Sequence, residues 1–82
     1  MLVNILSLNK ILYQGEAESL TAPGAKGTLT VLPHHAPLIT FLEKGKLKLK
    51  KEKELFFEIE KGILEVTPSE VNVLVSITEH SY

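Results

Sequence analysis

Two adjacent histidines, His34 and His35, are the side chains of this sequence best suited to chemistry. Imidazole binds zinc and exchanges protons near neutral pH, so the pair suggests a metal site or a general base. A zinc site needs three or four ligands, and adjacent residues tend to point in different directions. Only His80 adds an imidazole, and the chain contains no cysteine or aspartate. We therefore expect no metal site. The alternative hypothesis of an enzyme is a small metal-dependent hydrolase that uses His34, His35 and His80.

The serines do not have the surroundings of a catalytic nucleophile. A nucleophile elbow places its serine between glycines in a sharp turn. No serine of this chain is flanked in that way: Ser7, Ser19, Ser69, Ser76 and Ser81. We expect the 82 residues to form one domain, residues 1–82. A domain of this size buries only about 60% of its surface, which leaves little room for a catalytic cleft. The sequence thus predicts no catalytic residue and favours a binding role.

Composition narrows the class of partner. The net charge is −1, every basic residue is lysine and tryptophan is absent. Arginine makes paired hydrogen bonds to guanine and phosphate, and this chain has no arginine, so we expect no nucleic-acid partner. The longest apolar run, residues 38–42, is far shorter than the roughly 20 residues that cross a bilayer, and no signal-like N-terminal segment is present. We expect a soluble, unsecreted chain without a cofactor.

The histidines lie in a corner bounded by Pro33 and Pro37. Proline fixes φ and removes a backbone donor, so residues 33–36 cannot continue a sheet ladder. A stiff corner of this kind suits docking. Just before it, Gly24 and Gly27 bound a segment that lacks the spacing of a phosphate loop, and we expect a turn in which glycine supplies positive φ.

Around this corner the sequence alternates with period two, which is typical of half-buried strands. Strands are expected at residues 2–8, 10–14, 16–22, 28–32, 38–42, 46–50, 55–60, 62–67 and 71–78. The alternation places these side chains inward: Leu47, Leu49, Leu55, Phe57, Ile59, Val71, Val73, Val75 and Ile77. Turns are expected at Gly15, at Pro23–Gly24, and at Thr67–Glu70, where Pro68 fits a type I turn that closes a hairpin. Eight to ten short strands predict an all-β sandwich or flattened barrel.

Some apolar residues are out of phase with this alternation. Phe56 and Leu74 fall on the faces that their strands otherwise give to polar residues, and residues 38–42 are apolar on both faces. Single exposed apolar residues are ordinary on small sandwiches. Taken together, these positions favour a surface that docks another protein.

Lysines are concentrated between Lys44 and Lys53, a stretch that holds six of the nine. Alternating lysines followed by glutamates keep a hairpin soluble and discourage pairing of sheet edges. The rival hypothesis is a free-standing adaptor that binds an acidic protein through Lys46, Lys48 and Lys50.

The corner also carries a recognisable pattern. Gly27-x-Leu-x-Val-Leu-Pro-x-His35-Ala-Pro-Leu38, followed by Thr40, resembles the signature of the ε subunits of F-type ATP synthases. The resemblance continues in order through Gly45, Gly62-Ile-Leu-Glu-Val66 and Val71-x-Val-Leu-Val75. Tyr13-x-Gly15 stands where the family has an aromatic residue and a glycine. The match covers essentially the whole chain.

The resemblance implies a flattened sandwich of ten strands in two antiparallel sheets, without the two C-terminal helices that usually follow in the family. It implies a non-catalytic rotor subunit at the foot of the central stalk, which binds the γ subunit and the c-subunit ring and couples ion-driven rotation to ATP synthesis. No self-oligomer is expected. The implied place is peripheral, at the cytoplasmic face of the bacterial inner membrane in preference to the chloroplast thylakoid.

Carried over by position, the resemblance assigns two contact regions. The γ interface comprises Ser7, His35, Ala36, Pro37, Leu38 and Thr40, and the loop facing the c ring comprises Lys26, Gly27 and Thr28. Three positions depart from the family pattern: Thr28 replaces a common acidic residue, Thr30 a common glycine, and His34 a common glycine or asparagine. Ionic contacts with the ring are therefore not implied.

Overall fold

The computed structural model describes residues 1–77, which form nine strands and no helix. The strands are β1 (Leu2–Ser7), β2 (Ile11–Glu16), β3 (Ser19–Gly24), β4 (Gly27–Val31), β5 (Leu38–Leu42), β6 (Gly45–Lys50), β7 (Glu54–Ile59), β8 (Lys61–Val66) and β9 (Glu70–Ser76). The predicted all-β class is confirmed, and the count lies within the eight to ten strands expected. The tenth strand that the resemblance implies is not among residues 1–77.

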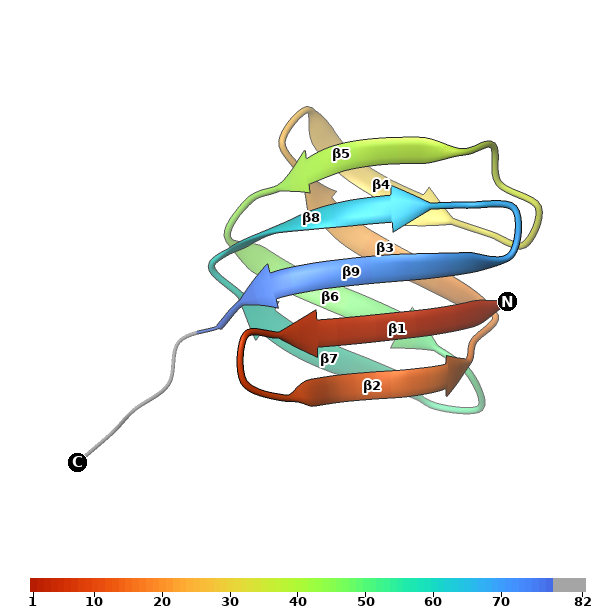
Figure 1. Ribbon diagram of the computed structural model, residues 1–82, viewed down its shortest axis with the longest axis horizontal. Coiled ribbons are helices and arrows are strands. Elements are labelled where there is room, and N and C mark those ends of the chain that lie inside the picture. The colour runs from red at the N-terminus through yellow and green to blue at the C-terminus, as the bar shows by residue number, and fades with distance from the viewer. Residues whose placement is uncertain (78–82) are drawn as a thin grey trace.

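The strands lie in two layers (Figure 1). The front layer has the order β5-β8-β9-β1-β2, and the rear layer has the order β4-β3-β6-β7. Gly24 of β3 pairs with Leu42 of β5, so the two layers join along one side into a continuous curled sheet. At the other side β2 and β7 are the layer edges, and the sandwich is open there.

One pair of strands departs from the antiparallel pattern. β1 pairs with β9 in parallel, from Leu2 opposite Glu70 to Ser7 opposite Val75. Every other pair among the described strands is antiparallel. A parallel pair cannot be closed by a tight turn, and here almost the whole chain separates the two strands. The expectation of purely antiparallel sheets therefore fails at this one position.

The alternation places a single apolar core between the layers. No polar or charged residue among residues 1–77 is fully buried. The buried hydrophobic residues are Val3, Ile5, Ala17, Leu20, Ala22, Val31, Leu42, Leu47, Leu49, Ile59, Leu64, Val66, Val71, Val73 and Val75. Phe57 and Ile77 are half-buried and pack against this cluster. Leu55, predicted to be buried, is exposed because β7 is an edge strand with no neighbour on one side.

Some residues predicted to form turns lie inside strands instead. Gly15 lies inside β2, opposite Val3, and Pro23 and Gly24 lie inside β3. The β3–β4 turn itself consists of residues 25–26, and Gly27 after it has a φ of +123°. The turn lies within the segment bounded by Gly24 and Gly27, so the expectation that a glycine supplies positive φ there is confirmed. The hairpin at Thr67–Glu70 is confirmed, with the Glu70 N–H donating to the Thr67 hydroxyl at 3.0 Å.

Candidate interaction surfaces

The proline corner is built around a type II turn. The His35 N–H donates to the Leu32 carbonyl at 3.1 Å, which makes Leu32–His35 a four-residue turn with Pro33 second and His34 third. His34 has a φ of 69°, the positive value that the third position of a type II turn requires. Glycine and asparagine take this conformation more easily than other residues, so the turn accounts for their frequency at this position in the resembled pattern.

His35 is fixed by its own backbone. Its Nδ1 lies 2.7 Å from the Ala36 carbonyl oxygen, and because a carbonyl only accepts, Nδ1 carries the proton. In the neutral form of the ring, Nε2 is then left as an acceptor for a donor from outside. His35 is half-buried and Ala36 and Pro37 are exposed, so the corner offers an ordered, outward surface.

The histidine pair does not assemble a metal site. Within residues 1–77, no three histidine or acidic side chains come close enough to hold an ion. His80 lies outside the described residues. His34 and His35 instead line a hollow of about 480 Å³ between the corner and the Thr67–Glu70 turn, bordered also by Met1.

The expected ring-facing loop is the tip of the β3–β4 hairpin. Lys26, Gly27 and Thr28 are all exposed there, and Figure 1 shows this hairpin projecting at one end of the molecule. The Ala25 N–H donates to the Phe41 carbonyl at 2.9 Å, which ties the tip to β5. Lys26 is the one charged residue of the tip, and Thr28 contributes only a hydroxyl.

The six residues assigned to the γ interface do not form one cluster. Ser7 pairs with Val75, Val75 with Gly62, and Gly62 with Leu42. Ser7 is thus level with the C-terminal end of β5, whereas the corner precedes Leu38 at the other end. With a rise of about 3.3 Å per residue, these ends are about 13 Å apart.

Thr40 lies between these ends but faces the interior. It pairs with Leu64, whose side chain is completely buried, and paired residues share a face of the sheet. His35, Ala36, Pro37 and Leu38 are therefore adjacent along the chain, while Ser7 and Thr40 occupy separate positions.

The outer face of the front layer carries apolar side chains that the sequence revealed only in part. The pairing of the strands aligns Phe41, Ile63, Leu74, Leu6 and Ile11, one from each of β5, β8, β9, β1 and β2. We call these five residues the apolar row. Phe41 is 69% exposed and Leu74 is 54% exposed. Leu74 and residues 38–42 were expected to contribute to such a surface. The exposure of Leu74, Ile39 and Phe41 is confirmed, whereas Leu38 and Thr40 are half-buried and Leu42 is buried. Ile63 could have been found as well, because it breaks the phase of Leu64 and Val66.

A polar row lies beside the apolar row. Asn4, Asn72 and Glu65 are aligned on adjacent strands. The Asn4 Nδ2 donates to Asn72 Oδ1 at 2.9 Å and to Glu70 Oε2 at 3.2 Å, and the Asn72 Nδ2 donates to Glu65 Oε1 at 3.1 Å. These bonds hold two carboxylates in place on the outer face.

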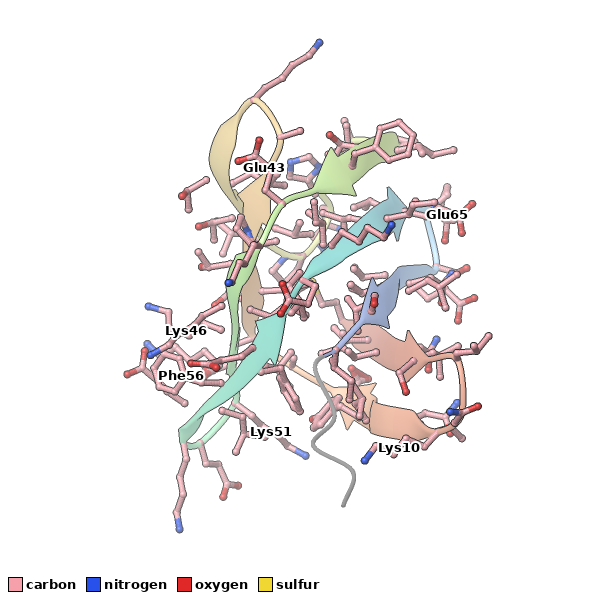
Figure 2. The ribbon with its side chains drawn as sticks, turned by 90° about the vertical axis from the view of Figure 1, so that its left-hand side faces the viewer. Lys10, Glu43, Lys46, Lys51, Phe56 and Glu65 are labelled. Atoms are coloured by element: carbon pink, nitrogen blue, oxygen red, sulfur yellow. The ribbon has the colours of Figure 1, made fainter. Side chains whose placement is uncertain are left out.

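The lysine-rich hairpin lies on the opposite side of the sandwich. Figure 2 shows Lys46 and Phe56 projecting from the rear layer and Glu65 from the front layer. Glutamates pair with the lysines: Lys48 lies 3.3 Å from Glu54, and Lys46 lies 4.0 Å from Glu58. These contacts offset part of the positive charge of the hairpin, which makes it less suited to an acidic partner.

A stiff corner, an ordered hairpin tip and an exposed apolar face define a small all-β sandwich domain whose surfaces suit binding more than catalysis. The model of the family described as "ATP synthase, Delta/Epsilon chain, beta-sandwich domain" matches residues 1–81, and the chain belongs to this family. No helix within residues 1–77 has the length and apolar character needed to cross a membrane.

Curated relatives agree with this assignment. The ATP synthase epsilon chain of Leptospira borgpetersenii is 42% identical over 79 residues, which is 95% of this chain and 60% of the relative. That of Halorhodospira halophila is 43% identical over 75 residues, 88% of this chain and 53% of the relative. The chain thus spans little more than half the length of these relatives.

Solved structures share the fold. A chain in the cryo-EM structure of the Euglena gracilis mitochondrial ATP synthase, comprising OSCP, F1 and c-ring, superposes with a TM-score of 0.83 at 19% identity over 89% of this chain and 48% of that chain. A chain of the Tetrahymena thermophila central stalk and c-ring gives a TM-score of 0.80 at 18% identity over 92% of this chain and 62% of that chain.

Proposed function

We propose that this chain is a non-catalytic part of the central stalk of an F-type ATP synthase. In this role it binds the γ subunit and the c ring and turns with them, so that ion-driven rotation reaches the catalytic head. The observation that carries the proposal is the family match over residues 1–81. Bacterial relatives support a place on the F1 sector at the cytoplasmic face of the inner membrane.

The mechanical properties of the domain suit a coupling element. A close-packed core between two joined layers deforms little, because side chains at interior density have no space to shift into. The hairpin tip at Lys26–Thr28 is the proposed contact with the ring, and its link to β5 through Ala25 would pass load into the sheet. The corner at His35–Leu38 is proposed to contribute to the γ contact, with Nε2 of His35 as an acceptor.

Co-purification tests the proposal. The tagged chain is expressed together with the γ and c subunits encoded by the same genome, and the complex is isolated in mild detergent. We expect both subunits to be retained, and to remain bound at about 0.5 M salt, where exposed ion pairs are screened. Recovery of the chain without γ and without c would overturn the proposal. Loss of both at high salt alone would favour the lysine-held adaptor.

A further inference from the structure

Strand β3 contributes to both layers of the sandwich. Its first residues, Ser19–Thr21, pair with β6 in the rear layer, whereas its last residue, Gly24, pairs with Leu42 of β5 in the front layer. Among the strands of residues 1–77, this is the one pairing that joins the two layers. The end of β3 is therefore where strand pairing sets the position of the rear layer against the front layer.

Two backbone hydrogen bonds form this junction, which we call the layer link. The Ala25 N–H donates to the Phe41 carbonyl at 2.9 Å. On the other side of the paired residues, the Glu43 N–H donates to the Pro23 carbonyl at 2.8 Å. Bonds in these places flank a non-hydrogen-bonded pair of antiparallel strands, in which the two Cα atoms lie only about 4.5 Å apart. The tip of the β3–β4 hairpin is therefore held close against the end of β5.

β5 connects the layer link to the proline corner. The corner at His35–Leu38 leads into β5, which has five residues and ends at the layer link. The hairpin tip at Lys26–Thr28 begins directly after Ala25, on the β3 side of the link. A single short strand therefore separates the proposed ring contact from the proposed γ contact.

Gly24 leaves no room for a side chain at the layer link. A Cβ built on it would stand 2.6 Å from the Gly27 carbonyl oxygen and 2.6 Å from Leu29 Cδ2. The end of the Leu29 side chain can rotate away, but the Gly27 oxygen belongs to the backbone of the tip. Because atoms in a packed interior cannot approach so closely, a side chain at position 24 has to displace the tip.

We propose that Gly24 is a positioning residue for the ring contact. It allows the hairpin tip to lie against β5 with both hydrogen bonds of the layer link formed, so that tip and corner turn as one rigid body. The functional part of this inference rests on the proposed function, in which the tip meets the c ring and the corner meets γ. A methyl group at position 24 moves the tip away from β5 and uncouples the two contacts.

Distances between spin labels test the position of the tip in the isolated chain. The chain has no cysteine, so two labelled pairs can be introduced: Lys26→Cys with Ser69→Cys, and Lys53→Cys with Ser69→Cys. The first pair joins the tip to the β8–β9 turn of the front layer, and the second joins the β6–β7 turn of the rear layer to the same point. In double electron–electron resonance, Gly24→Ala should shift or broaden the first distance distribution and leave the second unchanged.

Two further variants separate positioning from stability. Val3→Ala removes methyl groups from the core in β1, so it lowers stability and should leave both distributions unchanged. Ala25→Pro removes the N–H that donates to Phe41 while it fits the second position of a four-residue turn, and it should move the tip without a Cβ at position 24. A first distribution that neither Gly24→Ala nor Ala25→Pro alters would overturn the inference. A change of both distributions in Gly24→Ala would also overturn it, because the whole sandwich would then be disturbed.

Photo-crosslinking in the complex with γ and the c ring tests the consequence for the ring. A photoreactive label is attached to Thr28→Cys at the tip or to Ala36→Cys at the corner. We expect Gly24→Ala to lower the yield of the crosslink from the tip to the ring about tenfold, the loss of binding that corresponds to the usual strain of overpacking. The yield of the crosslink from the corner to γ should stay the same, and Val3→Ala should change neither yield.

The outcomes distinguish this inference from the proposed function. Wild-type crosslinks that Gly24→Ala leaves unchanged at both positions overturn the inference and leave the proposed function standing. Absence of wild-type crosslinks both to the ring and to γ overturns the proposed function. In that case the label distances alone decide whether Gly24 positions the tip.

Discussion

Gly62 of β8 lies directly against the backbone of Leu74 in β9. A Cβ built on Gly62 would stand 2.6 Å from the Leu74 carbonyl oxygen and 3.0 Å from Val75 Cγ1. The first of these atoms belongs to a paired strand and cannot move without breaking the ladder. Only glycine therefore fits, which gives the glycine of the Gly62–Val66 pattern a steric reason.

Gly62→Ala should accordingly destabilise the domain by about 1–3 kcal/mol, the usual cost of overpacking. Gly15→Ala is the control, because the nearest atom to its Cβ is the Tyr13 hydroxyl at an ordinary 3.4 Å. The control should change stability by less than about 1 kcal/mol. Urea unfolding of the three proteins measures the difference, and equal midpoints would contradict the steric account.

Replacing each of the adjacent histidines of the corner by glycine should change the stability of the domain in opposite directions. His34 has a φ of 69°, a conformation that strains residues other than glycine. Relief of this strain exceeds the added entropy of the unfolded chain, so His34→Gly should stabilise the domain by up to about 1 kcal/mol. His35 has no positive φ, so His35→Gly adds flexibility to the unfolded chain and also removes the hydrogen bond from Nδ1 to the Ala36 carbonyl. Both effects should lower stability. Thermal melting compares the two, and a fall in the midpoint of His34→Gly would refute the type II assignment.

Aspartate substitutions at neighbouring residues of β9 should show which side chains of the strand face the core. Val73 is 1% exposed and Leu74 is 54% exposed. Val73→Asp buries an unpaired carboxylate at a cost of several kcal/mol, against a total stability of about 5–15 kcal/mol, and should unfold the domain. Leu74→Asp should leave a cooperative melt, and Leu49→Asp in the facing layer should behave like Val73→Asp. Cooperative melting of both buried variants would mean that the strand phases are inverted.

His35→Glu should weaken the association with γ while the isolated domain stays folded. The substitution removes the Nδ1 donor that bonds the Ala36 carbonyl and places a negative charge on the half-buried corner. A pull-down of γ measures the association, and circular dichroism verifies the fold. Full retention of γ by the variant would remove the corner from the γ contact.

Much of the fold could be predicted because period two is a local property of the sequence. Leu47 and Leu49 between lysines identify β6, and Val71, Val73 and Val75 identify β9, without any knowledge of their neighbours. The positions of the turns were harder to predict from the sequence. Gly15 and Pro23 are turn-forming residues by type, but tertiary pairing placed both inside strands.

The apolar row shows why the surface could be predicted only in part. Leu74 and Phe56 stand out because they break the phase of their own strands. The alignment of Leu6, Ile11 and Ile63 with Leu74 depends on the register between strands far apart in the sequence, including the parallel β1–β9 pair. Register of that kind is set by the whole sheet and cannot be read from a single segment.

The parallel pairing of β1 with β9 also constrains how the domain is made. β1 finds one neighbour, β2, within a few residues of chain, but its other neighbour is β9, the last strand among residues 1–77. The front layer includes β9, so it cannot be completed during synthesis until residues 70–76 have emerged. Contacts between such distant segments also slow folding. Until then the β1–β2 hairpin exposes an unpaired edge of β1, which is the kind of edge that can pair with another chain.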